Sequence, residues 1–324
     1  MNLTDPIFQD ADKARAHLEA TRWPHGPICP HCGVVDDATQ LPAQRGRPTK
    51  AHPDGALRAG VLQCNACRGQ FSVTVGTVFE SSKVPLNKWL LATYLMSSSK
   101  MGYSAHQLHR TLGVTYKTAW FMCHRIREAM NPTTPGPMGG AGRTVEADET
   151  YVGGKEGNKH HAKRAAKGDL TGAKFPVLTL VEREGRARSF HVANVTSKTL
   201  RSVIVTNASR KSHLMTDGAR MYPAIGKEFA GFSSVDHSSG EYVRQGHHHS
   251  NTVENYFSIL KRGIVGTFHH VSEAHLSRYL DEFDFRYSNR SGLGVSDEQR
   301  TNMMLNATTG KRLTYRRPSE GANA

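Results

Sequence analysis

Four cysteines in two pairs carry the clearest metal-binding pattern in this sequence. The pairs are Cys29-x2-Cys32 and Cys64-x2-Cys67. A Cys-x-x-Cys turn places two thiolates close enough to share one tetrahedral zinc ion, and two such turns complete a closed structural site. The spacing predicts a Cys₄ zinc ribbon, with two redox dithiols or two disulfides as alternatives. His31 inside the first turn is expected to be a bystander, because four thiolates already fill the zinc shell.

Three acidic residues form the second set that could do chemistry: Asp148, Asp217 and Glu254. Carboxylates bind hard cations such as Mg²⁺ or Mn²⁺. Two such ions about 4 Å apart can activate the attacking oxygen and stabilise the leaving oxygen of a phosphodiester. Taken singly, each acid could be a turn, cap or helix-dipole residue, but together they predict a catalytic site. Lys261 follows Glu254 by two helical turns and could contact a phosphate.

The elements expected to carry these acids define the fold of the second half of the chain. RTVEADETYVGG is predicted to be a strand on which Glu146 and Asp148 share one face while Glu149 points the other way. Asp217 ends a later buried strand, and Glu254 lies in the first turn of the helix NTVENYFSILKRGIVG. The expected order is strand–strand–strand–helix–strand–helix–strand–helix. It predicts an α/β ribonuclease H-like core with a mixed five-stranded sheet.

A helix-turn-helix is predicted upstream of this core. The helices AHQLHRTLG and YKTAWFMCHRIREAM are joined by a turn at Gly113, and the second carries several basic residues. The alternative is a helical hairpin that only packs. Trp120, Phe121, Cys123 and Ile126 are expected in its core. The expected DNA contacts are Tyr116, Lys117, Thr118 and Arg125.

The composition indicates which kinds of binding partner the chain could have. The chain has 324 residues and 42 Lys and Arg against 28 Asp and Glu, a formal net charge of +14. Such a field favours a polyanion, most often nucleic acid, although a solubility charge spread over the surface is the alternative. The longest apolar run, Trp89 to Met96, is too short for a membrane span, and the first residues lack the pattern of a secretory signal. We therefore expect a cytoplasmic or nucleoid location and no membrane partner.

The shifts in composition suggest five segments. We expect a zinc ribbon in residues 1–82, a helix-turn-helix in 83–130 and a linker rich in Pro and Gly in 131–142. The catalytic core should occupy 143–290, followed by a basic polar tail in 291–324 that is partly disordered. Within the ribbon, the stretch from Val34 to Gly60 separates the cysteine pairs and is expected to be a looped-out insertion.

With these motifs the chain resembles insertion-sequence transposases that join an N-terminal zinc ribbon to a DDE-type core. The similarity runs through CPHCG, CNAC, LHRTLGVTYKTAWFMCHRIREAM, VEADETYVGG and TDGARMYP, and is most specific in HHHSNTVENYFSILKRGIVGTFHHVSEAHLSRYLDEFDFRYSNR. It implies Asp148 and Asp217 as the first two metal ligands. The third would be an acid in the NTVENYFSILK helix, followed by a lysine. Some relatives use asparagine there, so Asn251 is an alternative to Glu254, which we prefer because a carboxylate binds metal better than an amide.

The histidines around that helix have no assigned role. His247, His248 and His249 could line a DNA groove, position a water molecule or hold a loop. Direct metal ligation by the three is not favoured, because carboxylate sites of this class take Mg²⁺ or Mn²⁺. His269 and His270 are expected to be structural or to contact phosphate.

The sequence thus predicts a DNA transposase that binds the terminal inverted repeats of its element, cleaves DNA and transfers the strand. Structural Zn²⁺ and catalytic Mg²⁺ or Mn²⁺ are the expected cofactors. A homo-oligomer on DNA is expected, because two element ends must be joined in one event. The alternatives are a DNA-binding regulator with an inactive core, and a ribonuclease H-type nuclease that cuts without joining.

Overall fold

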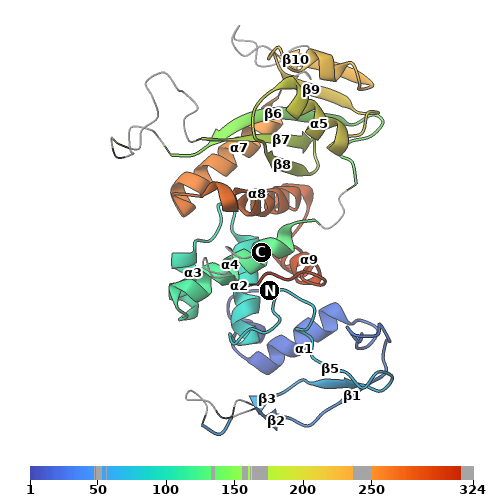
Figure 1. The fold of residues 1–324 in the computed structure, drawn as a ribbon, viewed down its shortest axis with the longest axis vertical. Helices are drawn as coiled ribbons and strands as arrows, with labels where there is room; N and C mark the ends of the chain where they lie inside the picture. The colour runs from blue at the N-terminus through green and yellow to red at the C-terminus, as the bar shows by residue number, and fades with distance from the viewer. Residues whose placement is uncertain are drawn as a thin grey trace. The chain divides into compact units, whose positions relative to one another are not determined.

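The chain forms two compact units. The computed structural model describes residues 1–46, 48, 53–55, 57–132, 136–154, 160, 162, 174–235 and 250–314. One unit, here the ribbon unit, comprises Met1–Ser98, Ala105–Ala129 and Asp297–Ala324. The other, the sheet unit, comprises Ser99–Ser104 and Met130–Ser296. Figure 1 shows the elements of each. Across the described residues, no helix is both long enough and apolar enough to cross a membrane.

The sheet unit has the predicted ribonuclease H-like topology. Its five strands lie in the order β10-β9-β6-β7-β8. β6, β7 and β8 are antiparallel neighbours, whereas β9 is parallel to β6 and β10 is parallel to β9. The strands are β6 (Thr144–Val152), β7 (Phe175–Glu182), β8 (Ala187–His191), β9 (His213–Asp217) and β10 (Gly231–Val235).

Helices cover both faces of this sheet. One apolar cluster joins α7 and α8 to the sheet, with Val177 and Val181 of β7 at its centre. The other joins α5 and α6 to it through the neighbouring side chains Leu178 and Leu180. This alternation follows from the period of two along a strand. The helices are α5 (Ser197–Asn207), α6 (Pro223–Gly226), α7 (Asn251–Gly263) and α8 (Glu273–Ser288), with a π-helical turn at Ile264–Phe268 and a short 3₁₀ helix at Ser291–Leu293.

The ribbon unit combines short strands with helices. A three-stranded sheet has the order β1-β4-β5, and β2 pairs with β3. The expected loop from Val34 to Gly60 therefore contains secondary structure: β1 in this stretch pairs antiparallel with β4, which ends at Cys64. The strands are β1 (Ala38–Gln40), β2 (Gln44–Arg45), β3 (Leu57–Arg58), β4 (Leu62–Cys64) and β5 (Gln70–Phe71), and the helices are the short 3₁₀ helix Pro6–Phe8, α1 (Ala11–Arg22), α2 (Leu86–Ser98), α3 (Ala105–Leu112) and α4 (Tyr116–Met130).

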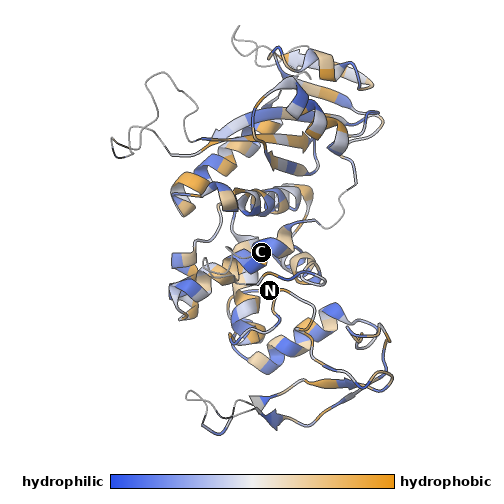
Figure 2. Ribbon diagram, in the orientation of Figure 1, coloured by the Kyte–Doolittle hydropathy of each residue, from blue (hydrophilic) through white to orange (hydrophobic). Residues whose placement is uncertain are grey.

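The C-terminal segment differs from the polar tail that the sequence suggested. Asp297–Asn306 forms helix α9, which packs against α2 in the ribbon unit. The Ser97 and Thr301 hydroxyls lie 2.8 Å apart, and the Arg300 guanidinium donates to the Ser97 carbonyl at 3.0 Å. Most residues of α9 are polar, so the composition did not distinguish this helix from a polar tail. Figure 2 colours each residue of the chain by its hydropathy.

Two adjacent methionines in α9 give a matched test of this packing. Met304 is 0% exposed, whereas Met303 is 48% exposed. Met304→Ala should lower the free energy of unfolding of the ribbon unit by about 2–4 kcal/mol through a buried cavity. Met303→Ala should change it by less than about 0.5 kcal/mol. Urea denaturation of both variants measures the difference, and equal losses would show that α9 is not docked on α2.

Candidate active site and metal centre

The four cysteines of the ribbon unit converge on one point. The Sγ atoms of Cys29 and Cys67 lie 3.7 Å apart, and those of Cys32 and Cys64 lie 3.6 Å apart. All four sulfur atoms fall within 4.8 Å of one another, and none forms a disulfide. A tetrahedral ion with Zn–S bonds of about 2.3 Å requires sulfur atoms about 3.8 Å apart. The geometry fits one shared zinc ion rather than two separate dithiols or disulfides.

The backbone at the first cysteine turn also favours metal binding. Burial alone would raise the pKa of the Cys29 thiol, but hydrogen bonds from the backbone N–H groups of His31 and Cys32 and from the Cys32 and Cys67 thiols lower that pKa to about 6. Contacts with the neighbouring thiols, Cys29 among them, raise the pKa of Cys32 and Cys67. A thiol with a low pKa is readily present as the thiolate, which is the zinc ligand. The His31 ring lies 3.2 Å from the Gln70 carbonyl, as expected of a bystander.

Asp148 and Asp217 lie side by side in the sheet unit. β6 and β9 run parallel with Ala147 opposite Thr216, so the next residue on each strand is one of the two acids. Asp217 is the last residue of β9. The parallel register therefore brings together two carboxylates that are 69 positions apart in the sequence.

The third acid approaches from α7. Glu254 is exposed in the first turn of this helix, and α7 packs against β6. Burial raises the pKa of Asp148 to about 7, and the negative charges of Asp217, Glu149 and Glu254 add to that rise. The other two predicted acids, Asp217 and Glu254, therefore both contribute to the electrostatic field at Asp148. Among the described residues, however, the cysteines are the one group of three or more His, Cys, Asp or Glu side chains whose ligand atoms lie close enough to share a metal ion.

Glu149 is a fourth acid near Asp148, and the alternation along β6 predicts that it points to the opposite face of the sheet. Its side chain does leave the face of Asp148, because it accepts a hydrogen bond from the hydroxyl of Tyr222, which is buried in the cluster beneath α5 and α6. Burial raises the pKa of Glu149, and the charge of Asp217 raises it further. Glu149 therefore adds negative charge at the centre from the opposite face. Its place next to Asp148 was the sequence signal for this role.

A buried carboxylate sets the position of α7. Glu146 is 0% exposed on β6. One of its oxygens accepts the backbone N–H groups of Thr252 and Val253 at 2.9 and 3.0 Å. The other accepts the Thr252 hydroxyl at 2.9 Å and the Arg183 guanidinium at 2.7 Å. Because Glu254 comes directly after Val253, this contact fixes the third acid relative to the strand that carries Asp148.

The remaining predicted residues of α7 lie along its surface. Lys261 is exposed, and its ammonium lies 5.9 Å from the centre of the Phe257 ring. Asn251 is exposed at the first position of the helix. His269 and His270 are also exposed, and the His269 ring lies 2.9 Å from the Val265 carbonyl. His247, His248 and His249 lie outside the described residues.

The helix pair α3 and α4 presents part of the expected DNA-contacting surface. The Thr115 hydroxyl accepts the backbone N–H of Thr118 at 3.2 Å, which caps α4 as its sequence predicts. Tyr116 and Lys117 are exposed and Thr118 is half-buried. These three residues lie at the start of α4, where the sequence places its DNA contacts. A helix-turn-helix function for the pair remains a prediction.

The structure does not support the predicted DNA contact of Arg125. Its side chain was expected to contact DNA, but it is only 6% exposed. The guanidinium donates to the Glu80 carbonyl at 2.6 Å and lies over the rings of Trp89 and Phe121. Burial lowers its pKa. Arg125 holds the ribbon unit together instead, and the expected burial of Cys123 beside it is confirmed.

Two family models match the chain. A transposase zinc-ribbon domain matches residues 9–70, and an ISXO2-like transposase domain matches residues 139–288. The chain therefore belongs to the insertion-sequence transposases that carry a zinc ribbon. It is 29% identical, over 86% of its length and 91% of the relative's, to an uncharacterized protein in transposable element ISH50 of Halobacterium salinarum.

Two solved structures show weaker likeness. One is a simian T-cell lymphotropic virus intasome in complex with the PP2A regulatory subunit B56 gamma, with a TM-score of 0.28 and 15% identity over 55% of this chain and 67% of that chain. The other is a pre-cleavage Mos1 transpososome, with a TM-score of 0.27 and 11% identity over 64% and 75%. At these scores, the strand order of the sheet unit is the stronger evidence for its fold.

Zinc content tests the cysteine cluster. Cys64→Ser removes one buried thiolate, and we expect the purified protein to fall from about one zinc ion per chain to a small fraction of one, because a structural site needs its four ligands. The ribbon unit should then melt at a lower temperature. Cys123→Ser is the matched control and should keep its zinc. Full zinc content in Cys64→Ser would contradict the cluster.

Hydrogen exchange tests the role of Glu146. Glu146→Gln keeps the shape of the side chain but removes the negative charge of the carboxylate that accepts hydrogen bonds from two helix N–H groups and Arg183. We expect a loss of roughly 3 kcal/mol in stability and faster exchange at the amides of Thr252 and Val253. Glu182→Gln is the control, since Glu182 is also buried but accepts from the backbone N–H of Gly139. Unchanged protection of α7 in Glu146→Gln would refute the anchoring role.

Proposed function

We propose that this transposase cuts and joins DNA at the carboxylate centre of the sheet unit, with Asp148, Asp217 and Glu254 as its DDE triad. The observation that carries the proposal is the accumulation of acids around Asp148. Burial and three neighbouring carboxylates raise the pKa of Asp148 to about 7. Like charges at close range cost free energy, and a sheet kept only for packing gains nothing from them. Such a cost is typical of a site that binds cations.

The donor set suits hard divalent ions. Asp148, Asp217 and Glu254 offer carboxylate oxygens, which Mg²⁺ and Mn²⁺ prefer. The acids need not meet at a single point, because a pair of ions about 4 Å apart spreads its ligands over a wider span than one ion does. When bound, such ions supply Lewis-acid activation of the attacking oxygen and stabilisation of the leaving oxygen. Asn251, at the start of the same helix, is the alternative third ligand.

The proposed reaction has two displacements at phosphorus. In the first, water attacks a phosphodiester at the element end; a P–O bond forms to water, the P–O3′ bond breaks, and a 3′-hydroxyl and a 5′-phosphate remain. In the second, that 3′-hydroxyl attacks a target phosphodiester, forms a new P–O bond and releases a target 3′-hydroxyl. The acids would hold the divalent ions beside the scissile phosphate, and Lys261 would contact a phosphate from the exposed side of α7.

The ribbon unit would supply recognition of the DNA ends. Tyr116, Lys117 and Thr118 stand at the exposed start of α4, where the second helix of a helix-turn-helix reaches base edges. The terminal inverted repeats are the proposed ligand. Because two repeats must be joined to one target, a homo-oligomer on DNA is the proposed working form.

Substitution of the acids tests this function. Asp217→Asn keeps the shape and removes the charge, and we expect roughly 10³-fold or greater loss of both cleavage and strand transfer. The assay uses DNA carrying the element's flanking repeats, with Mg²⁺ or Mn²⁺, and detects nicked and joined products. Glu254→Gln should behave like Asp217→Asn. Glu273→Gln, an exposed acid at the start of α8, is the control and should remain active.

The product pattern separates the alternatives. Joined products from wild type alone support the transposase assignment. Cleavage without joining would indicate a nuclease, and specific binding without cleavage in either metal would indicate a DNA-binding regulator. If Glu254→Gln is active and Asn251→Ala is not, Asn251 is the third ligand.

A further inference from the structure

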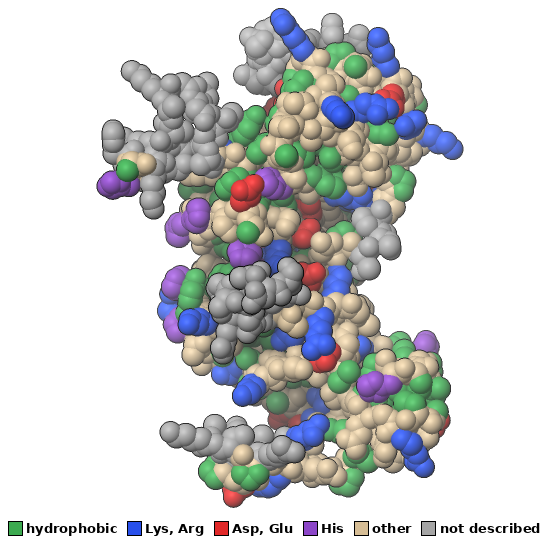
Figure 3. Space-filling model, viewed as in Figure 1, with side chains coloured by type: hydrophobic (Ala, Val, Ile, Leu, Met, Phe, Trp, Pro, Cys, Tyr) green, Lys and Arg blue, Asp and Glu red, His purple; other side chains and the backbone are tan. Residues whose placement is uncertain are grey.

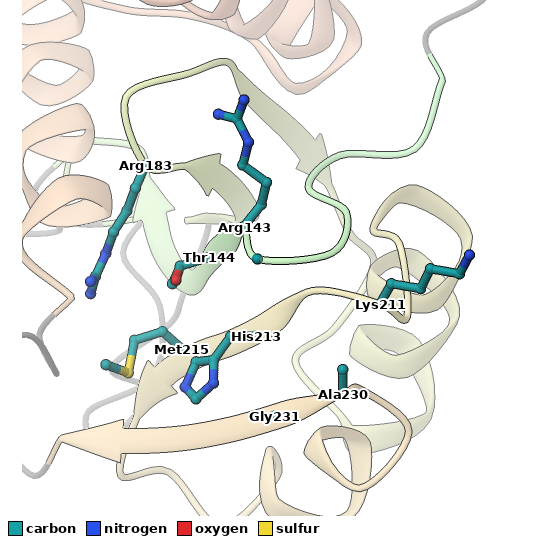
Figure 4. A pocket seen from close by; sticks show the side chains of 9 residues that line it. Arg143, Thr144, Arg183, Lys211, His213, Met215, Ala230 and Gly231 are labelled. Atoms are coloured by element: carbon teal, nitrogen blue, oxygen red, sulfur yellow. The ribbon is translucent and has the colours of Figure 1, made fainter.

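A hollow lies at the end of the sheet opposite the carboxylate centre. β6, β9 and β10 run parallel and begin at Thr144, His213 and Gly231, so their first residues share one edge of the sheet. Asp217 ends β9 at the other edge. The hollow has a volume of about 330 Å³. Its lining includes Arg143, Arg183, Lys211, His213, Met215 and Gly231, shown in Figure 4.

The hollow carries a net positive charge. Arg143 and Lys211 are exposed; Arg143 directly precedes β6, and Lys211 lies two positions before β9. In the part of the chain that the structure describes, no acid forms an ion pair with either side chain. Arg183 is different, because Glu146 shares its charge at 2.7 Å. Figure 3 shows further Lys and Arg side chains over the part of the sheet unit where α5, β9 and β10 lie.

The directions of the three basic side chains distinguish between anions. In Figure 4, Arg143, Arg183 and Lys211 extend away from the hollow in three different directions. A small anion needs donors that converge on it, and these do not. A polyanion with charges spread along its length, such as a DNA strand with one phosphate about every 3.4 Å of helix axis, matches cations that are spread out.

The distance to the carboxylate centre suits a single duplex. Asp148 lies four positions after Thr144 on β6, and Asp217 lies four positions after His213 on β9. At about 3.3 Å per residue, the hollow and the acids lie roughly 13 Å apart along the strands. The major groove of B-DNA is about 12 Å wide. A duplex with one phosphate at the acids could therefore place another near the hollow.

We propose that the basic surface around this hollow is a second DNA contact, at which Arg143 and Lys211 hold the phosphate backbone about one groove width from the bond being cut. The inference rests on the proposed function, because it takes the same duplex as its ligand. Gly231 at the start of β10 leaves room for the His213 ring, because a Cβ there would lie 2.4 Å from the ring's Nδ1. Arg183 contributes less, since it is engaged with Glu146.

Salt dependence of DNA binding tests the contact. The full chain carrying Arg143→Gln and Lys211→Gln is titrated onto a duplex with the element's flanking repeat, without divalent metal, across a series of NaCl concentrations. We expect at least about tenfold weaker binding at low salt and a decrease of about 2 in the slope of log K against log salt, about one for each phosphate contact. The unfolding temperature must match wild type.

A control removes the same charge elsewhere. Arg15→Gln with Arg201→Gln also lowers the net charge by two, but both arginines are already paired, with Asp12 and Glu228 respectively. We expect this variant to keep the slope of wild type. Equal slopes for wild type and Arg143→Gln/Lys211→Gln would overturn the inference while leaving the proposed function intact. No binding of wild type to any DNA would overturn both.

Inorganic phosphate is the last arm of the test. If the hollow were a small-anion site, orthophosphate would shift the NMR signals of His213 at submillimolar concentration, and the double variant would lose that shift without any change in DNA binding. That result would contradict a contact with the DNA backbone. We expect no saturable shift in this range.

Discussion

Glu146 is a buried carboxylate between β6 and the start of α7, and the carboxylate centre depends on the bonds that it makes. A helix N-terminus carries unpaired N–H groups and a positive dipole, so an ionised carboxylate is its natural partner. Here the partner comes from a strand rather than from the helix itself. These hydrogen bonds fix the position of Glu254 relative to Asp148, because Asp148 follows Glu146 by two residues and Glu254 follows Val253 by one.

The carboxylate centre is negative, although the chain has a formal net charge of +14. Four acids contribute to the field there: Asp148, Glu149, Asp217 and Glu254. The strand register forces the first three together, and α7 brings the fourth. A basic exterior attracts the DNA polyanion, whereas a compact acidic centre would repel it unless cations lie between. In the proposed function, the basic surface therefore serves DNA recognition and the acidic centre serves the chemistry.

The sequence predicted those features whose signals are local. Two Cys-x-x-Cys turns predicted the sulfur cluster, and alternation along VEADETYV predicted the faces of Glu146 and Asp148, because both patterns follow from backbone geometry. It missed features that depend on distant partners. Arg125 reads as a surface cation, but the Glu80 carbonyl and the Trp89 ring bury it. The anchoring role of Glu146 likewise depends on a helix that begins 105 positions later.

Location of bound Mn²⁺ tests the central claim most directly. Crystals of the full chain grown with Mn²⁺ and a short duplex of the flanking repeat would be measured at the manganese absorption edge. The account predicts anomalous peaks between Asp148, Asp217 and the first turn of α7, and none there in Asp148→Asn. If wild type shows no peak at these acids while the duplex is bound, the carboxylate centre is not the catalytic metal site.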